Sequence, residues 1–313
     1  MHTPALFRFR FPSHPVFKRL FQCLALQIVV SASLEAATIG YWRFEENAFL
    51  ADSSGNGYAL TTPGSFGSPA QYALPATGIG SNFPSSVGGH ANGHAVQGAG
   101  ANNTFQNRQL STNIGAPGTN LDKELTIEAF FNLSYSSASS SSVIASQGAG
   151  ATSGASWGLT VTSGGSSVGG RNLVFQYNKT GGTWGTDLAL IDTDIVIELD
   201  KDYYVAFTID FADVTSAGVT VYLKNLTDDT ELQVLNLTHS SNFTTMAKTS
   251  APLTIGTGND GTLPFYGVID EVRLSDTKLG YNDLLIAAMI PEPSTYAFLA
   301  GAAATLLVVR RRR

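Results

Sequence analysis

Short segments in which apolar and polar residues alternate recur throughout the middle of this chain. In the clearest of them, Gly218 to Lys224, one face is Val219, Val221 and Leu223 and the other is Thr220, Tyr222 and Lys224. A period of two indicates a β-strand with one buried face. Clusters of Gly, Ser, Asn and Asp separate these segments, and helical periodicity is almost absent. The pattern therefore predicts an all-β sandwich of two antiparallel sheets.

About a dozen strands are expected from such segments, with Pro63 to Gly93 as a surface excursion and Ser134 to Gly170 as hairpins with Ser/Gly-rich loops. Trp42, Trp157 and a stripe formed by Leu173, Phe175 and Tyr177 are predicted to be core. One short closing helix is predicted at Asn282 to Met289, capped by Asn282. The remaining strands are predicted at Thr38 to Glu46, His94 to Gln97, Phe105 to Leu110, Leu125 to Phe131, Asn172 to Asn178, Asp194 to Leu199, Tyr203 to Asp210, Thr230 to Leu237, Leu253 to Gly256 and Phe265 to Leu274.

The N-terminal segment has the three regions of a secretory signal peptide. Four basic residues lie before Leu20, an apolar core runs from Leu20 to Val30, and small residues follow up to Ala37. We therefore expect residues 1–36 to direct export through the Sec pathway and to be removed, with cleavage after Ser33, Ala36 or Ala37. The only cysteine, Cys23, lies in this leader, so the mature domain is predicted to have no disulfide.

The last 24 residues, 290–313, form a second distinctive segment. It contains Pro291, Glu292 and Pro293, then an apolar run from Tyr296 to Val309, then the basic cluster Arg310, Arg311, Arg312 and Arg313. Fourteen helical residues rise about 21 Å, which is enough for a short transmembrane helix where the bilayer thins. By itself the run is also compatible with an ordinary C-terminal anchor or a buried helix with a basic end.

The order of these three parts resembles the PEP-CTERM sorting signal of Gram-negative, exopolysaccharide-producing bacteria. The resemblance implies that an exosortase in the inner membrane recognises Pro291, Glu292 and Pro293 and removes the tail. It also implies a precursor that is anchored transiently in the inner membrane, and a product at the cell surface or in the extracellular matrix. Arginines that follow a span favour the cytoplasmic side, which places the rest of the chain across the membrane.

The charge of the part between the two ends limits its partners. Residues 37–289 contain 10 basic and 22 acidic residues, a net charge of −12. Such a charge argues against nucleic acid or anionic membrane as a partner and is suited to binding cations.

Three segments in the expected order resemble the laminin-G-like jelly roll (concanavalin A-like lectin/glucanase) domains of bacterial surface proteins. They are Tyr41 to Glu45 with the turn Asp52 to Gly57, then Leu125 to Asn132, then Gly267 to Leu274 with its Ile-Asp-Glu-Val-Arg core. The resemblance implies one domain over residues 37–289. It also implies a structural calcium near the first turn and the closing strand, with Asp52, Asn56 and Asp270 as oxygen ligands.

The residues of the closing strand leave an alternative to calcium open. Simple alternation places Asp270 on the same face as Val268, Val272 and Leu274. If that face is the core face, the buried carboxylate must be neutralised or hydrogen-bonded. It could instead accept hydrogen bonds from the backbone amides of the Asp52 to Gly57 turn, without any metal.

Candidate ligand-binding and catalytic residues are few. Trp184, in a Gly-rich loop, could stack on a sugar ring or fold back onto the sandwich. Hydrolases of the resembled fold need paired carboxylates at alternate positions on one face of a strand. Asp192 and Asp194 share a face, but the next acid on that face is Glu198, which is too far along the strand to continue the alternating pattern. We therefore predict no catalytic residues and no enzyme activity.

These observations predict an exported surface or matrix protein whose jelly roll binds carbohydrate or another matrix component, with calcium as its only expected cofactor. Two other functions remain open at this stage. One is a glycoside hydrolase or lyase of the same fold, and the other is a purely structural matrix protein.

Overall fold

The computed structural model describes residues 38–64, 67–98, 108–115, 121–137, 140–148, 156–165, 170–179, 187–247, 249–259 and 261–289. The chain divides into two compact units, Met1–Ala36 and Ala37–Arg313, and all of the described residues belong to the second unit.

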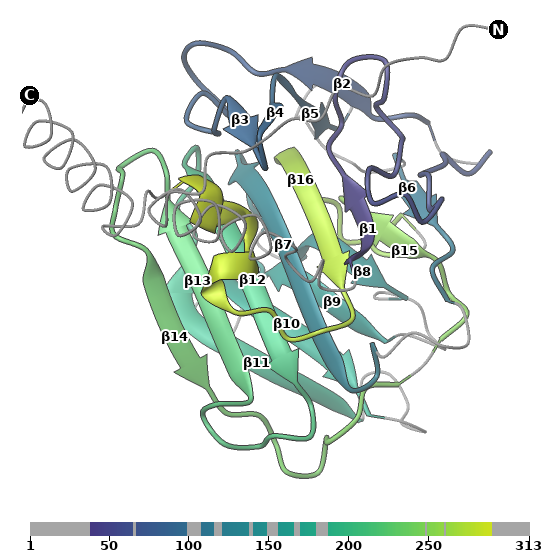
Figure 1. The fold of residues 1–313 in the computed structure, drawn as a ribbon, viewed down its shortest axis with the longest axis vertical. Helices are drawn as coiled ribbons and strands as arrows, with labels where there is room; N and C mark the ends of the chain where they lie inside the picture. Colours follow the sequence, from purple (N-terminus) through teal and green to yellow (C-terminus); the bar gives the residue numbers. More distant parts are fainter. Residues whose placement is uncertain are drawn as a thin grey trace, which may run out of the picture. The chain divides into compact units, whose positions relative to one another are not determined.

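Sixteen strands and two short 3₁₀ helices are present in the described residues (Figure 1). The strands are β1 (Thr38–Trp42), β2 (Ala70–Ala73), β3 (Ser86–Val87), β4 (His90–Ala91), β5 (His94–Gln97), β6 (Leu110–Thr112), β7 (Glu124–Leu133), β8 (Ser142–Gln147), β9 (Trp157–Val161), β10 (Asn172–Asn178), β11 (Leu188–Val196), β12 (Asp202–Asp210), β13 (Val219–Asn225), β14 (Gln233–Leu237), β15 (Leu253–Ile255) and β16 (Gly267–Ser275). The helices are η1 (Tyr281–Asp283) and η2 (Leu285–Met289).

Two antiparallel sheets contain nearly all of these strands. One has eight strands, in the order β14-β13-β12-β7-β16-β5-β2 with β1 also paired to β16. The other has six, in the order β11-β10-β9-β8-β15-β6, and β3 and β4 form a separate hairpin. The predicted all-β sandwich of two antiparallel sheets is therefore confirmed.

The core between the sheets follows the alternation seen in the sequence. In β7, Leu125, Ile127, Ala129 and Phe131 are buried members of the core cluster. The predicted core tryptophans and the stripe on β10 are confirmed, since all of them are fully buried. Phe175 of β10 stacks on Phe207 of β12, with ring centroids 5.8 Å apart, and so joins the two sheets. Offset aromatic pairs of this kind add stability beyond the area that they bury.

The segment 63–93 is more than the predicted surface excursion. It contributes β2 to the eight-stranded sheet, and its buried Phe83 packs against Phe130 on that sheet's outer face. Asp202 at the start of β12 holds it there. The carboxylate of Asp202 accepts hydrogen bonds from the backbone N–H of Gly80 at 2.8 Å and from that of Asn82 at 2.9 Å.

The predicted single closing helix capped by Asn282 is wrong. The segment forms η1 and η2 instead, separated by Leu284 in an extended conformation, and the N-cap position of η1 is Gly280, without a side-chain cap. The reason lies in the sheet below. The N–H of Leu285 donates to the Glu128 carboxylate at 2.8 Å. This N–H therefore does not form the backbone hydrogen bond that one continuous helix would require. We call residues 276–289 the C-terminal strap.

Glu128 is the anchor of the C-terminal strap. Its side chain is fully buried on the outer face of β7 and accepts hydrogen bonds from Arg273 Nε at 2.7 Å and from Tyr204 Oη at 2.5 Å. Burial, followed by the charge of Glu128, raises the pKa of Tyr204 well above its usual value. Arg273 also donates from Nη2 to the carbonyl of Asp283, so one ion pair connects β7, β16 and the strap.

We predict that Glu128→Ala destabilises the fold by about 3–5 kcal/mol, because it leaves Arg273 and Tyr204 without their buried partner. The free energy of unfolding from urea titration measures this. Lys224→Ala is the control, since it removes a pair whose acid, Asp229, is 87% exposed and should change little. A Glu128→Ala protein as stable as the unmodified one would contradict the anchor role.

Candidate functional site

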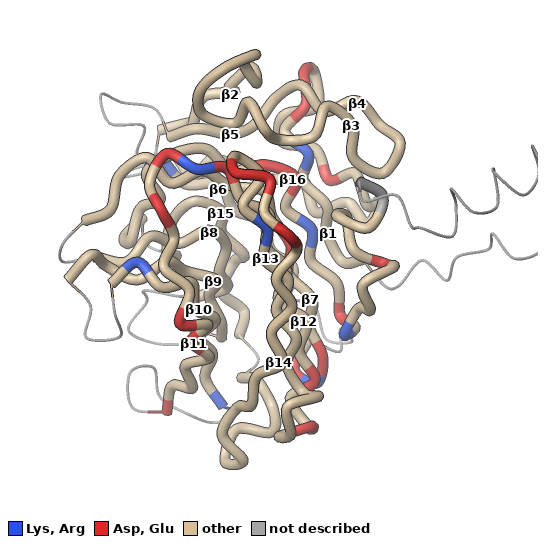
Figure 2. The backbone as a smooth tube through the Cα atoms, turned by 90° about the vertical axis from the view of Figure 1, so that its left-hand side faces the viewer, with Lys and Arg blue, Asp and Glu red and all other residues tan. Residues whose placement is uncertain are grey.

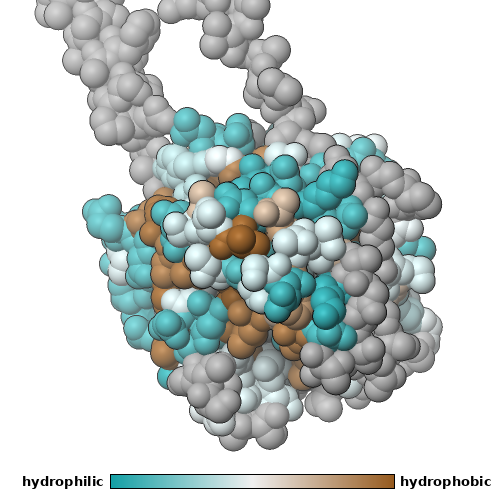
Figure 3. All heavy atoms as spheres, turned by 90° about the horizontal axis from the view of Figure 1, so that it is seen from below, coloured by the Kyte–Doolittle hydropathy of each residue, from teal (hydrophilic) through white to brown (hydrophobic). Residues whose placement is uncertain are grey.

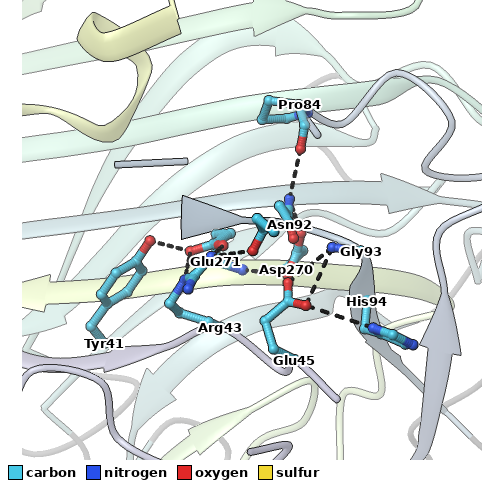
Figure 4. A network of polar contacts seen from close by, with 10 residues as sticks. Tyr41, Arg43, Glu45, Pro84, Asn92, Gly93, His94, Asp270 and Glu271 are labelled. Atoms are coloured by element: carbon cyan, nitrogen blue, oxygen red, sulfur yellow. Dashed lines mark hydrogen bonds and ion pairs between the residues drawn. The ribbon is translucent and has the colours of Figure 1, made fainter. Parts of the chain in front are cut away.

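A network of polar side chains gathers where β1 and β16 meet the segment that connects β4 to β5 (Figure 4). The strand β1 and the loop that follows it supply Tyr41, Arg43 and Glu45, and the strand β16 supplies Asp270 and Glu271. The connecting segment supplies Asn92 and Gly93, and the start of β5 supplies His94. Its hydrogen bonds, burial and charge make it the strongest candidate site in the described residues.

A β-bulge in β16 decides which way these carboxylates point. The register of β16 against β7 shifts between Asp270 and Arg273, and Glu271 has a φ of 50°. Ile269 and Val272 therefore both face the core, although they lie three residues apart. The predicted alternation, with Asp270 on the core face beside Val272, is wrong because the bulge inserts one extra residue. Asp270 instead lies on the outer face, opposite Phe130 of β7.

Glu271 has a cationic partner. Its carboxylate, fully buried, is 3.0 Å from Arg43 Nη2 and also accepts a hydrogen bond from the Tyr41 hydroxyl. Burial, followed by the charge of Glu271, raises the pKa of Tyr41 far above its usual range, so Tyr41 remains a donor. The negative charge of Glu271 is therefore compensated within the protein.

Asp270 has no such compensation among the described residues. It is fully buried, and its two oxygens accept hydrogen bonds from Asn92 Nδ2 at 2.9 Å and from the N–H of Glu271 at 2.8 Å. Burial and then the charge of Glu271 raise the pKa of Asp270 well above its usual value, and Glu45 raises it further. A buried carboxylate without a cation is costly.

Two further residues at the same place, Asn92 and Glu45, carry oxygen atoms that could bind a cation. Asn92 is 5% exposed and donates to Asp270 and, at 3.0 Å, to the carbonyl of Pro84, but its own Oδ1 has no hydrogen-bond partner. The Glu45 carboxylate accepts the N–H of Gly93 at 3.0 Å and is 3.6 Å from His94 Nδ1. Carboxylate, amide and carbonyl oxygens are the ligands that Ca²⁺ prefers.

The protein leaves Asn92 Oδ1 without a hydrogen bond and Asp270 without a cationic partner. A hard cation would provide a partner for both groups. Within the described ranges no group of three or more His, Cys, Asp or Glu side chains is arranged to hold a metal. A cation at this place would use the carboxylates of Glu45 and Asp270 together with amide and carbonyl oxygens, including Asn92 Oδ1. Of these three residues only Asp270 is predicted from the sequence as a calcium ligand, and Glu45 and Asn92 are not.

The other two predicted calcium ligands make different contacts. Both oxygens of Asp52 accept backbone amides, from Tyr41 at 3.0 Å, Ser54 at 2.9 Å and Tyr58 at 2.9 Å. Burial raises the pKa of Asp52, but its hydrogen bonds lower that pKa by more, so the pKa lies below its usual value. Asn56 donates to the carbonyl of Thr38 at 2.7 Å. Asp52, and not Asp270, thus fastens the turn to β1, and no hydrogen bond of the described residues joins either of these two side chains to Asp270.

The acids on the sheets have structural partners. Glu128 and Asp202 hold covering segments, as described above, and are at most 1% exposed. Asp192, considered above as a catalytic partner of Asp194, accepts Asn172 Nδ2 at 3.0 Å and the N–H of Asp194 at 2.9 Å. Asp194 itself has a φ of 56°, which breaks the regular alternation that a pair on one face would need.

Several predicted residues lie outside the described ranges. They are Trp184, Cys23, the motif Pro291 to Pro293, the apolar run Tyr296 to Val309 and the four terminal arginines. Among the residues that the structure does describe, none forms a helix with the length and apolar character needed to span a bilayer.

Comparison with solved structures found distant similarity. Domain 4 of AbnA, an extracellular arabinanase of Geobacillus stearothermophilus solved with arabinotriose, is 15% identical, with a TM-score of 0.47 over 78% of this chain and 95% of that one. The binding domain of botulinum neurotoxin DC, solved with SialylT, is 11% identical, with a TM-score of 0.48 over 82% of this chain and 52% of that one. The chain thus spans about half the length of the neurotoxin domain.

Comparison with protein families gave a more direct result. No curated protein matches this sequence significantly. A family model does match, over residues 106–284, which include β7, β16 and most of both sheets. With that match extending over more than half of its length, the chain belongs to the concanavalin A-like lectin/glucanases superfamily.

Proposed function

We propose that this protein is a non-catalytic carbohydrate-binding protein of the cell surface or extracellular matrix. The observation that carries the proposal is its membership of a superfamily whose description names lectins and glucanases. The burial of four carboxylates on the eight-stranded sheet supports binding over hydrolysis. Glu128, Asp202, Asp270 and Glu271 are all at most 1% exposed, and a glycosidase needs two carboxylates that flank the substrate's scissile bond.

Tryptophan fluorescence tests the carbohydrate proposal. Trp42 and Trp157 are fully buried, so a dissolved sugar contacts neither of them. We expect at least one member of a polysaccharide panel to shift the emission of the full chain in mild detergent, and Trp184→Phe to abolish the shift. Unchanged emission together with no binding by calorimetry would contradict the proposal, and new reducing ends in the mixture would favour the hydrolase alternative.

The second part of the proposal is a structural calcium ion held by Glu45, Asn92 and Asp270. The unpaired Asn92 Oδ1 and the uncompensated carboxylate of Asp270 support it, because both defects are removed by one divalent cation. Such an ion would connect the loop after β1, the segment before β5 and the bulge of β16. Its contribution would be to the stability of this end of the sandwich.

Calcium should raise the melting temperature, and EDTA should lower it, because the ion binds the folded state and not the unfolded chain. Asp270→Asn removes the buried charge, so this variant should fold but respond to neither addition. Asp52→Asn is the matched control: it weakens the turn and lowers the melting temperature, yet keeps the calcium response. A calcium response lost with Asp52→Asn but kept with Asp270→Asn would overturn this choice of ligands.

The third part of the proposal concerns export and sorting. The leader in residues 1–36 and the PEP-CTERM-like tail in residues 290–313 support secretion, transient anchoring in the inner membrane of a Gram-negative host and removal of the tail by an exosortase. In the described structure the strap ends with η2 at Met289, two residues before Pro291. The folded part and the tail thus adjoin almost without a linker.

Replacing Pro291 and Glu292 by alanine should leave the tail attached and keep the protein in the inner-membrane fraction. Mass spectrometry of the C-terminal peptide and cell fractionation measure the two effects. Arg108→Ala, which leaves the tail unchanged, serves as the control and should be processed normally. Full-length protein with both ends intact in the cytosol of its host would contradict the sorting proposal.

A further inference from the structure

Among the described residues, the large hydrophobic side chains that remain exposed are few and are mostly aliphatic. They are Tyr135, Leu190, Val196 and Val234, and Tyr135 is the only aromatic one, 51% exposed. On the face that Figure 3 shows, apolar residues lie in patches bordered by polar ones. An exposed aromatic ring is therefore unusual on this surface.

Tyr135 does not extend freely into solvent. Its ring meets that of Tyr266 edge to face, with centroids 5.0 Å apart and an interplanar angle of 73°. Tyr266 in turn packs against the core. The backbones on which the two rings stand are also joined, because both the N–H and the hydroxyl of Ser134 donate to the carbonyl of Tyr266, at 2.8 and 3.1 Å. The Tyr135 ring is thus held in place before any ligand arrives.

The place of this pair in the fold suits a ligand. Tyr135 follows the end of β7 and Tyr266 precedes the start of β16, so both lie at the end of the eight-stranded sheet where these central strands meet (Figure 1). Neither phenol hydroxyl has a hydrogen bond to another described residue. A fixed ring with an apolar face and a free hydroxyl can stack on the C–H face of a sugar and bond to its hydroxyls.

The charges beside the pair indicate which sugars fit. The N–H of Asp200 donates to the carbonyl of Leu133 at 2.9 Å, which places Asp200 next to the chain that leads into Tyr135. Asp200 is exposed and forms no ion pair in the described part, whereas its neighbour Lys201 pairs with Asp228 at 2.7 Å. Acidic residues also outnumber basic ones along the described chain (Figure 2). This environment accepts hydrogen bonds from sugar hydroxyls and repels carboxylates and sulfates.

We propose that Tyr135, supported by Tyr266, is a stacking platform for a neutral hexopyranose, with Asp200 as an acceptor for the sugar's hydroxyls. The inference rests on the proposed carbohydrate-binding function and names a binding residue and a ligand class for it. It is independent of Trp184, because it uses only residues that the structure places together.

Isothermal titration of the full chain in mild detergent tests this site. The probes are neutral tetrasaccharides of glucose, mannose and galactose, and a tetrasaccharide of galacturonate. We expect at least one neutral probe to bind and galacturonate to bind more weakly. Tyr135→Ala should weaken binding of the neutral probe about tenfold, and Tyr135→Phe should weaken it less, because the ring remains. Tyr135→Leu should behave like the alanine variant while still covering Tyr266.

Val234→Ala is the matched control, since Val234 is also 51% exposed but lies on β14. Its affinity should equal that of the unmodified protein, and all variants should keep the same melting temperature. If neutral probes bind but Tyr135→Ala and Tyr135→Leu bind them equally well, the platform is wrong while the carbohydrate function stands. Tighter binding of galacturonate would overturn the ligand class. Failure of every tetrasaccharide and of the polysaccharide panel would overturn both proposals.

Discussion

Buried carboxylates on the outer face of the eight-stranded sheet hold the irregular parts of this protein in place. Asp202 binds the amides of the segment before β3, Glu128 binds the C-terminal strap, and Glu271 binds Arg43 beyond β1. Strand pairing alone fixes the sheets, but a covering segment without regular structure needs acceptors for its own N–H groups. A buried carboxylate offers several acceptor positions at one point and forms stronger hydrogen bonds than a neutral oxygen.

This arrangement has a consequence for stability. Burying each charge costs several kcal/mol of desolvation, and this cost is offset only when a counter-charge or a full set of hydrogen bonds surrounds the carboxylate. Glu128 and Glu271 have an arginine each, and Asp202 has four hydrogen-bond donors, three of them from two asparagines. Asp270 has two donors and no cation in the described residues. It is therefore the one of the four whose environment favours an additional positive charge, which an external ion can provide.

The sequence predicts the regular part of this fold well and the irregular part poorly, for a physical reason. Period-two alternation records which face of a strand is buried, so β7, β10 and β13 could be read directly. A β-bulge cannot be recognised from the alternation. The positive φ of Glu271 reverses the faces of β16 after Asp270, and this is seen only in the register of β16 against β7. The roles of Asn92 and Tyr135 could not be predicted either, because they depend on Asp270 and Tyr266, which lie more than 100 positions away along the chain.

The covering segments also decide where a ligand can reach the protein. Phe130 and Tyr204, on the outer face of β7 and β12, are fully buried, with Phe83 5.9 Å from Phe130 ring to ring. The middle of this face is therefore filled by the protein itself, through the segment that Asp202 holds and the strap that Glu128 holds. For the carbohydrate binding that we propose, this leaves the ends of the strands, where the connections begin, as the part of this sheet open to a ligand. Tyr135 lies at such an end, and its ring contacts Tyr266, which packs against the core. Because the fold already orders this ring, a ligand that binds it does not incur the entropic cost of ordering it.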